Sequence, residues 1–174
     1  MVRKSTPGVT LSSDNIVLIG MAGAGKSTVG VLLAKALYRN FIDTDLVVQS
    51  AEGCRLQDTV NDVGKAAFQE IEEKHVLSIR VPGAVIATGG SVVYSERAMT
   101  HLKTSGTVVY LQLPLDQLEA RVLNLDTRGL AMESNQTFAD LYRERLPLYE
   151  KYADVTIPCE GLNHEEVVTA ICAL

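Results

Sequence analysis

A glycine-rich segment near the start of the chain has the residue types and the spacing of a phosphate-binding loop. Residues 20–28 read Gly-Met-Ala-Gly-Ala-Gly-Lys-Ser-Thr and follow directly on the apolar run 16–19. A G-x-x-x-x-G-K-[ST] pattern between a strand and a helix typically binds the phosphates of a nucleoside triphosphate. Lys26 is expected to reach the β- and γ-phosphates, and Ser27 to bind Mg²⁺. The residues expected to contact the nucleotide here are Gly23, Ala24, Gly25, Lys26, Ser27 and Thr28.

Two carboxylates follow the next apolar segment. Asp43 and Asp45 are separated by one residue at the end of the strand expected over 40–43. Residues two apart in an extended segment point to the same side. One carboxylate is therefore expected to hold a metal-bound water, while the other accepts a proton from an acceptor hydroxyl. The alternative is that Asp45 is only the N-cap of the helix that begins there.

Glycines and arginines follow the later strands. Gly89 and Gly90 end an apolar strand, where paired glycines let a ligand approach the backbone closely. Arg128 lies in the polar stretch 124–136, which suits a lid that closes over a transferring phosphoryl group. A third position, Arg145 or its neighbour Arg143, is expected to bind a carboxylate. Composition alone does not separate these two arginines.

The elements that must position these residues alternate between strands and helices. Such alternation predicts an α/β fold with a parallel sheet covered by helices, whose ligands gather at the carboxyl ends of the strands. The expected strands are 16–19, 40–43, 84–88, 107–113 and 155–158. The expected helices are 27–38, 45–51, 56–63, 66–80, 95–104, 115–123, 137–152 and 164–173.

Length and composition bound the remaining possibilities. The 174 residues suit a single domain over 15–174, preceded by a disordered tail over 1–14. A net charge of −5 argues against a nucleic-acid partner, and no apolar run is long enough to cross a membrane. The three cysteines are odd in number and lack metal-ligand spacing, so they are expected to be reduced thiols of a cytoplasmic protein. We expect a monomer.

Taken together, these motifs resemble the shikimate kinase family from Ile16 onward. The resemblance rests on the order and spacing of GMAGAGKST, FIDTD, the segment FQEIE, ATGG, Arg128 and ERLPLYEKYAD. It implies a P-loop kinase fold, a three-layer sandwich with a five-stranded parallel sheet, helices on both faces and a lid. It also implies transfer of a phosphoryl group from ATP, with Mg²⁺, to the 3-hydroxyl of shikimate on the route to aromatic amino acids. The acceptor-binding region is then about 44–80.

Roles for single residues follow from the same resemblance. Asp43 resembles the residue that holds Mg²⁺ through water, and Asp45 the one that bonds the acceptor hydroxyls. Arg145 matches the arginine on the substrate carboxylate, and Arg128 the lid arginine that touches phosphate and acceptor. Gly89 and Gly90 are similar to acceptor contacts. Arg121 is similar to the arginine near adenine, and the turn 157–163 falls where the family encloses the base.

The chain departs from the family pattern at the acceptor site. Gln69 stands where the family has a second carboxylate-binding arginine, and Ser91 stands at the third glycine of an ATGGG run. Lys65 replaces a usual glutamate, and Arg128 is not followed by the usual proline. Gln69 is retained as an expected substrate contact. These departures leave the nucleotide site intact and predict an altered recognition of the acceptor.

Three classes of function remain open at this point. The first is a small-molecule kinase acting on shikimate or on a related hydroxy acid or polyol. The second is a GTPase, which the D-x-x-G pattern at 126–129 suggests weakly, although the sequence contains no N-K-x-D for guanine. The third is a catalytically silent relative. The presence of every residue expected to bind phosphate and metal favours the kinase.

Overall fold

The computed structural model describes residues 14–122 and 136–174. The expected tail, apart from Asp14, therefore lies outside the described residues. So does the expected lid, apart from Gln136, and with it the predicted phosphate contact Arg128.

Five parallel strands form one sheet in the order β2-β3-β1-β4-β5. Every residue of β1 is buried, because β1 pairs with β3 on one side and β4 on the other. The phosphate-binding segment that follows β1 therefore starts from the centre of the sheet. The strands are β1 Asn15–Ile19, β2 Asn40–Asp43, β3 Ala84–Ala87, β4 Gly106–Gln112 and β5 Val155–Pro158. The predicted α/β class with a five-stranded parallel sheet is confirmed.

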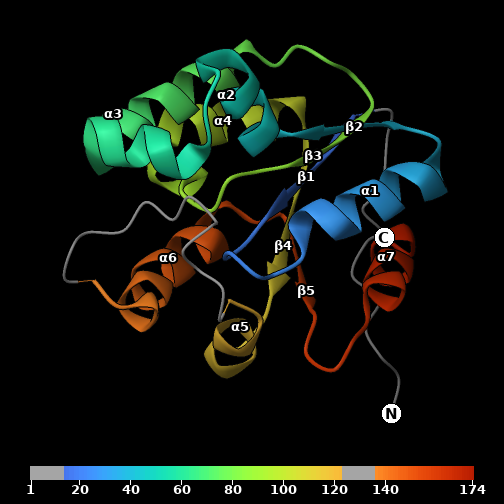
Figure 1. Ribbon diagram of the computed structural model, residues 1–174. Helices are drawn as coiled ribbons and strands as arrows, with labels where there is room; N and C mark the ends of the chain where they lie inside the picture. The colour runs from blue at the N-terminus through green and yellow to red at the C-terminus, as the bar shows by residue number, and fades with distance from the viewer. Residues whose placement is uncertain (1–13, 123–135) are drawn as a thin grey trace.

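Helices cover both faces of the sheet. Figure 1 shows α1 and α7 side by side on one face and α4 and α6 on the other, with α2 and α3 packed together beyond β2 and β3. The helices are α1 Lys26–Leu37, α2 Thr44–Glu52, α3 Leu56–Ser78, α4 Glu96–Ser105, α5 Leu115–Val122, α6 Phe138–Tyr152 and α7 His164–Cys172. A 3₁₀ turn, η1, spans Val92–Tyr94. Each expected helix is present within a residue or two of its predicted ends.

Helix α3 contains a break at Gly64. The backbone there has φ 80° and ψ 167°, which no α-helix accommodates. The sequence predicted two helical stretches, 56–63 and 66–80, and the structure has two helical segments that meet at this glycine. The break lets the two halves of α3 take different directions.

The buried apolar side chains form two clusters. The larger surrounds the sheet and includes Ile16–Ile19 of β1 and Ala84–Ile86 of β3. The smaller, here called the α2–α3 core, lies apart from it between those two helices. It consists of Val48, Leu56, Val60 and Phe68, with Ile71 packed against it. The residues expected to bind the acceptor are therefore divided between the sheet and a helical unit with its own small core.

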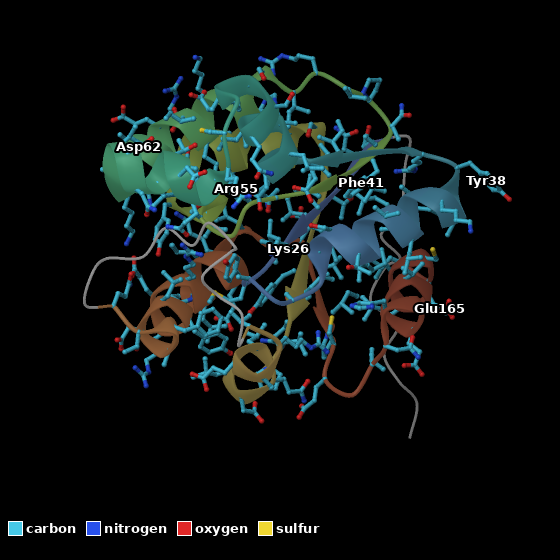
Figure 2. All side chains as sticks on the ribbon, viewed as in Figure 1. Lys26, Tyr38, Phe41, Arg55, Asp62 and Glu165 are labelled. Carbon is cyan, nitrogen blue, oxygen red and sulfur yellow. The ribbon has the colours of Figure 1, made fainter. Side chains whose placement is uncertain are left out.

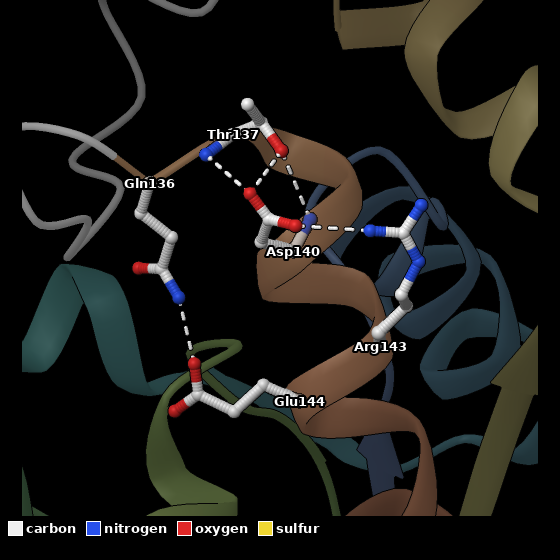
Figure 3. A network of polar contacts seen from close by, with 5 residues as sticks. All are labelled: Gln136, Thr137, Asp140, Arg143 and Glu144. Carbon is white, nitrogen blue, oxygen red and sulfur yellow. Dashed lines mark hydrogen bonds and ion pairs between the residues drawn. The ribbon is translucent and has the colours of Figure 1, made fainter.

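Helix α6 begins with a capping box. The Thr137 hydroxyl accepts a hydrogen bond from the Asp140 N–H at 3.1 Å, and the Asp140 carboxylate accepts one from the Thr137 N–H at 3.1 Å (Figure 3). Gln136 also donates to Glu144 at 2.6 Å, one turn further along the helix. These contacts fix the start of the helix that carries Arg145. No helix in the described part of the chain is long and apolar enough to cross a membrane.

Candidate active site

The loop after β1 has the geometry of a phosphate-binding loop. Gly25 is the N-cap of α1 with φ 89°, a conformation that side chains disfavour, and within the described residues no side chain caps this helix. Lys26 folds back over the loop, and its ammonium donates to the carbonyls of Gly20 at 2.8 Å and Met21 at 2.9 Å. Open N–H groups, a helix N-terminus and a lysine converge here, and this combination suits a bound anion.

Ser27 and Asp43 meet beside this loop. The Ser27 hydroxyl donates to Asp43 Oδ2 at 2.6 Å, and the other carboxylate oxygen accepts from the Asp45 N–H at 3.0 Å. Asp43 is therefore the N-cap of α2, and the alternative that Asp45 plays this part is wrong. Because the last residue of β2 is itself the N-cap, α2 starts one residue earlier than predicted. Two oxygen atoms of the kind that Mg²⁺ binds therefore lie close together beside the loop.

Asp45 lies in the first turn of α2 and faces the cavity beside the loop. Burial and the neighbouring Asp43 carboxylate raise the pKa of Asp45 to about 6, whereas the Lys26 ammonium lowers it. A carboxylate with a pKa close to neutrality is suited to accept a proton from a hydroxyl.

The paired glycines after β3 run close to charged side chains from three directions. A side chain at Gly89 would overlap Glu72 Oε1 and would lie 2.8 Å from Asp45 Oδ1. A side chain at Gly90 would lie 2.9 Å from Arg145 Nη1. Glycine at both positions thus lets carboxylates and a guanidinium converge on one backbone segment.

Arg145 is among the largest fully buried side chains in the described part of the chain, with 1% of its surface exposed. Its Nε donates to the Tyr94 hydroxyl at 3.2 Å, and its guanidinium lies 5.2 Å from the centre of the Tyr94 ring. Arg145 Nη2 is buried and has no hydrogen-bond partner among the described residues. By contrast, Arg143 is exposed and pairs with Asp140. The structure separates the two arginines, and Arg145 is the one at the cavity.

Glu72 and Ser91 form a buried pair to which the sequence assigned no role. Glu72 is 3% exposed, and its Oε2 accepts a hydrogen bond from the Ser91 hydroxyl at 2.7 Å. Burial raises the pKa of Glu72 to about 7, with a further upward contribution from Asp45, while Ser91 and Arg145 act in the opposite direction. Only the tertiary fold reveals this pair, because 19 residues separate its members in the sequence.

One cavity of about 460 Å³ joins these groups. It runs from the phosphate-binding loop, past Asp45, to the glycine pair and Arg145. Arg55 and Phe68 line it from the side of α2 and α3. Gln69 is half-buried on α3 but does not line the cavity, so its predicted contact with substrate stays a prediction. Residues 23–28, except Ala24, line the cavity as expected for the nucleotide end.

Two further residues singled out in the sequence lie at the margins. Arg121, at the end of α5, donates weakly to the Gly23 carbonyl at 3.5 Å, which places it beside the phosphate-binding loop. Lys65 lies 4.0 Å from Glu144 and 5.5 Å from the centre of the Tyr94 ring. Lys65 thus contacts the α6 side of the molecule rather than the cavity lining.

Comparisons with known proteins agree with this geometry. The sequence model of the family described as "Shikimate kinase" matches residues 22–174. A shikimate kinase of Thermodesulfovibrio yellowstonii is 38% identical over 160 residues, which cover 90% of this chain and 92% of that protein. The chain belongs to the shikimate kinase family. It is therefore an ATP-dependent kinase, and this membership removes the GTPase alternative.

Solved structures of the shikimate kinase family extend the match to three dimensions. The shikimate kinase of Acinetobacter baumannii in complex with shikimate superimposes with a TM-score of 0.84 at 30% identity, covering 93% of this chain and 92% of that one. The shikimate kinase of Aquifex aeolicus gives a TM-score of 0.76 at 33% identity, covering 91% and 94%. These matches confirm the predicted P-loop kinase fold of the family.

Proposed function

We propose that this protein transfers the γ-phosphoryl group of ATP to the 3-hydroxyl of shikimate. The observation that carries the proposal is the continuous cavity that joins the phosphate-binding Lys26 to Asp45 and Arg145. A phosphate donor and a hydroxylated carboxylic acid fit end to end in such a space. The relative from Acinetobacter baumannii, solved in complex with shikimate, supports the choice of acceptor.

Lys26 is proposed to bind the β- and γ-phosphates. Its present partners are two loop carbonyls, which an incoming triphosphate would replace with stronger, charge-assisted contacts. The N–H groups at the start of α1 would bind the same phosphates, and Arg121 would lie toward the base. Since phosphoryl transfer depends mainly on positioning and on electrostatic stabilisation, these contacts would supply much of the catalysis.

Ser27 and Asp43 are proposed to hold Mg²⁺, Ser27 directly and Asp43 through water. Their oxygen atoms already lie 2.6 Å apart, and Mg²⁺ favours one or two protein oxygens combined with phosphates and waters. When bound, the ion would offset the negative charge of the phosphates.

Asp45 is proposed to accept the proton of the attacking hydroxyl at a carboxylate oxygen. Arg145 would bind the carboxylate of the acceptor through Nη2, the buried nitrogen that has no partner among the described residues. Gly89 and Gly90 would let the ring approach the backbone between these two side chains. Arg128 is proposed to reach the transferring phosphoryl group. The cytoplasmic location and the monomeric state expected from the sequence stay predictions.

A second candidate acceptor is a related hydroxy acid or polyol. It is favoured by the neutral Gln69 and by the Ser91 hydroxyl, which occupies a place beside Glu72. Membership of a family of ATP-dependent kinases disfavours the third alternative, a catalytically silent relative. The two candidate acceptors make different predictions for turnover.

The decisive experiment measures ATP consumption with and without shikimate. Wild-type protein is expected to turn over only with shikimate, and Asp45→Asn is expected to lower kcat by about 10²–10⁴, the range for a positioned general base. Asp62→Asn is the control, because Asp62 is exposed on the outer side of α3, away from Lys26 (Figure 2). If ATP is consumed only with a different acceptor, that compound would replace shikimate as the proposed substrate. No turnover with any acceptor would contradict the proposal.

A further inference from the structure

Arg55 carries a positive charge on the cavity wall that the proposed roles leave unused. It lies between α2 and α3, and its side chain is exposed and lines the same cavity as Asp45 and Arg145. Figure 2 places Arg55 on the α2–α3 side, across from Lys26 at the start of α1. Among the described residues, no hydrogen-bond acceptor or carboxylate pairs with its guanidinium.

The local structure gives no reason for an arginine at this position. Arg55 is the N-cap of α3, where Ser, Thr, Asp or Asn normally accepts a hydrogen bond from the first turn. Arginine has no acceptor, and within the described residues α3 has no side-chain cap. The Arg55 carbonyl still accepts from the Thr59 N–H at 3.0 Å, a contact that any residue provides. The side chain therefore does not serve the helix.

The other two cations of the cavity are already constrained. Lys26 is held against the carbonyls of the phosphate-binding loop. Arg145 is buried next to Gly90; its Nε donates to Tyr94, and its buried Nη2 has no partner among the described residues. A carboxylate has two oxygens, each able to accept more than one hydrogen bond, so a single Nη2 group leaves much of its capacity open. Among the described residues that line the cavity, Arg55 is the remaining cation, and its exposed side chain can reach toward such a carboxylate.

We propose that Arg55 binds the carboxylate of the acceptor from the α2–α3 side, while Arg145 binds it from α6. Arg55 is then a specificity-determining residue that favours anionic acceptors over neutral polyols. The planar guanidinium can form two parallel hydrogen bonds with a carboxylate. This inference rests on the proposed function, since it assumes a hydroxy acid as acceptor.

The test measures kcat and both KM values for wild type, Arg55→Ser and Arg55→Lys. Arg55→Ser is expected to raise the KM for shikimate about tenfold, a smaller effect than for the buried Arg145, because solvent weakens an exposed pair. The kcat and the KM for ATP are expected to stay within about twofold, and Arg55→Lys to retain part of the affinity. The matched control is Arg97→Ser, an exposed arginine outside the cavity that pairs with Glu73.

A stability measurement separates binding from structure. Serine is a favoured N-cap, so Arg55→Ser is expected to melt at or above the temperature of the wild type while it binds shikimate more weakly. A loss of both stability and affinity would overturn the inference, because Arg55 would then act through the fold.

The carboxamide of shikimate supplies the second arm of the test. Wild type is expected to prefer shikimate over the carboxamide, and Arg55→Ser to lose about tenfold of this preference. An unchanged preference in Arg55→Ser overturns the inference while the proposed function stands. A rise in the KM for ATP instead also overturns it and makes Arg55 a phosphate ligand. If wild type phosphorylates no shikimate, the proposed function fails, and the inference fails with it.

Discussion

At the scale of single residues, the unusual feature of this site is a carboxyl group buried behind the acceptor cavity. Glu72 is 3% exposed, and its oxygens face Ser91 on one side and the Gly89 backbone on the other. Burial raises its pKa to about 7, well above the 4.5 of a solvated glutamate. The ionised form of Glu72 is therefore costly in the folded protein, although the Ser91 hydroxyl offsets part of the cost.

This shift in the pKa of Glu72 predicts a pH-dependent stability. The folded state binds the proton more tightly than the unfolded state, so the stabilisation is present at low pH and is lost as pH rises through about 7. Glu72→Gln removes the titrating group. Between about pH 5 and pH 8, the free energy of unfolding of wild type is expected to fall by on the order of 2 kcal/mol more than that of Glu72→Gln.

Urea unfolding of the nucleotide-free protein at the two pH values measures this difference. Glu70→Gln, at an exposed position of the same helix, is the control for the loss of a glutamate. An equal change in wild type and Glu72→Gln would contradict the prediction.

The sequence predicted the place of some residues of the candidate site but not of others, for a geometric reason. Lys26, Asp43, Asp45 and the glycine pair all follow strands of a parallel sheet, whose carboxyl ends meet at one edge. Gln69 follows Phe68 on a helix, where consecutive side chains point about 100° apart. Because Phe68 faces the cavity, Gln69 is turned away from its lining. Arg55 belongs to a connection without periodicity, so only the tertiary structure reveals its position.

At the scale of elements, the spacing of apolar residues and the positions of glycines and polar residues were enough to predict nearly every helix and strand boundary. Strands β1, β3 and β4 contain continuous apolar runs, and some helices have side-chain caps, such as Thr137 before α6 and Asn163 before α7. The two helical stretches predicted over 56–63 and 66–80 meet at Gly64. The pattern of elements did not predict that the α2–α3 core is separate from the main core, because this separation depends on the directions of the two halves of α3.

Gly64 and Gly53 provide a matched pair of substitutions for testing the break in α3. Both have positive φ and open space around them, but Gly53 has ψ 16°, in the left-handed helical region, whereas Gly64 has ψ 167°. Asparagine tolerates the first conformation and is strongly disfavoured in the second. Gly53→Asn is expected to change the free energy of unfolding by a few tenths of a kcal/mol, and Gly64→Asn to lower it by about 1–3 kcal/mol. Chemical denaturation measures the free energy of unfolding of both variants. Equal losses would mean that asparagine is no more strained at position 64 than at position 53.

At the scale of the whole molecule, the site joins two parts whose apolar cores differ in size. The phosphate-binding loop and the glycine pair extend from strands that are completely buried in the main core. Arg55 and the remainder of the α2–α3 side are supported by four buried apolar residues, Val48, Leu56, Val60 and Phe68. A small core offers less apolar burial to resist opening. The acceptor is therefore expected to contact both parts, and the nucleotide mainly the part with the larger core.

Native-state hydrogen exchange tests this division. In the free protein, amides of α2 and of α3 before Gly64 are expected to exchange through openings of lower free energy than amides of β1 and β4. Shikimate at about 100 times its Kd is expected to slow exchange in α2 and α3 by up to about 100-fold, because opening of this unit would destroy the site. A non-hydrolysable ATP analogue serves as the control ligand, since its proposed contacts lie on the loop and α1. Equal protection of α2 and β1 in the free protein would contradict the division. If shikimate slowed only the exchange that requires global unfolding, the α2–α3 unit would open only together with the sheet. Acceptor binding would then stabilise the molecule as a whole.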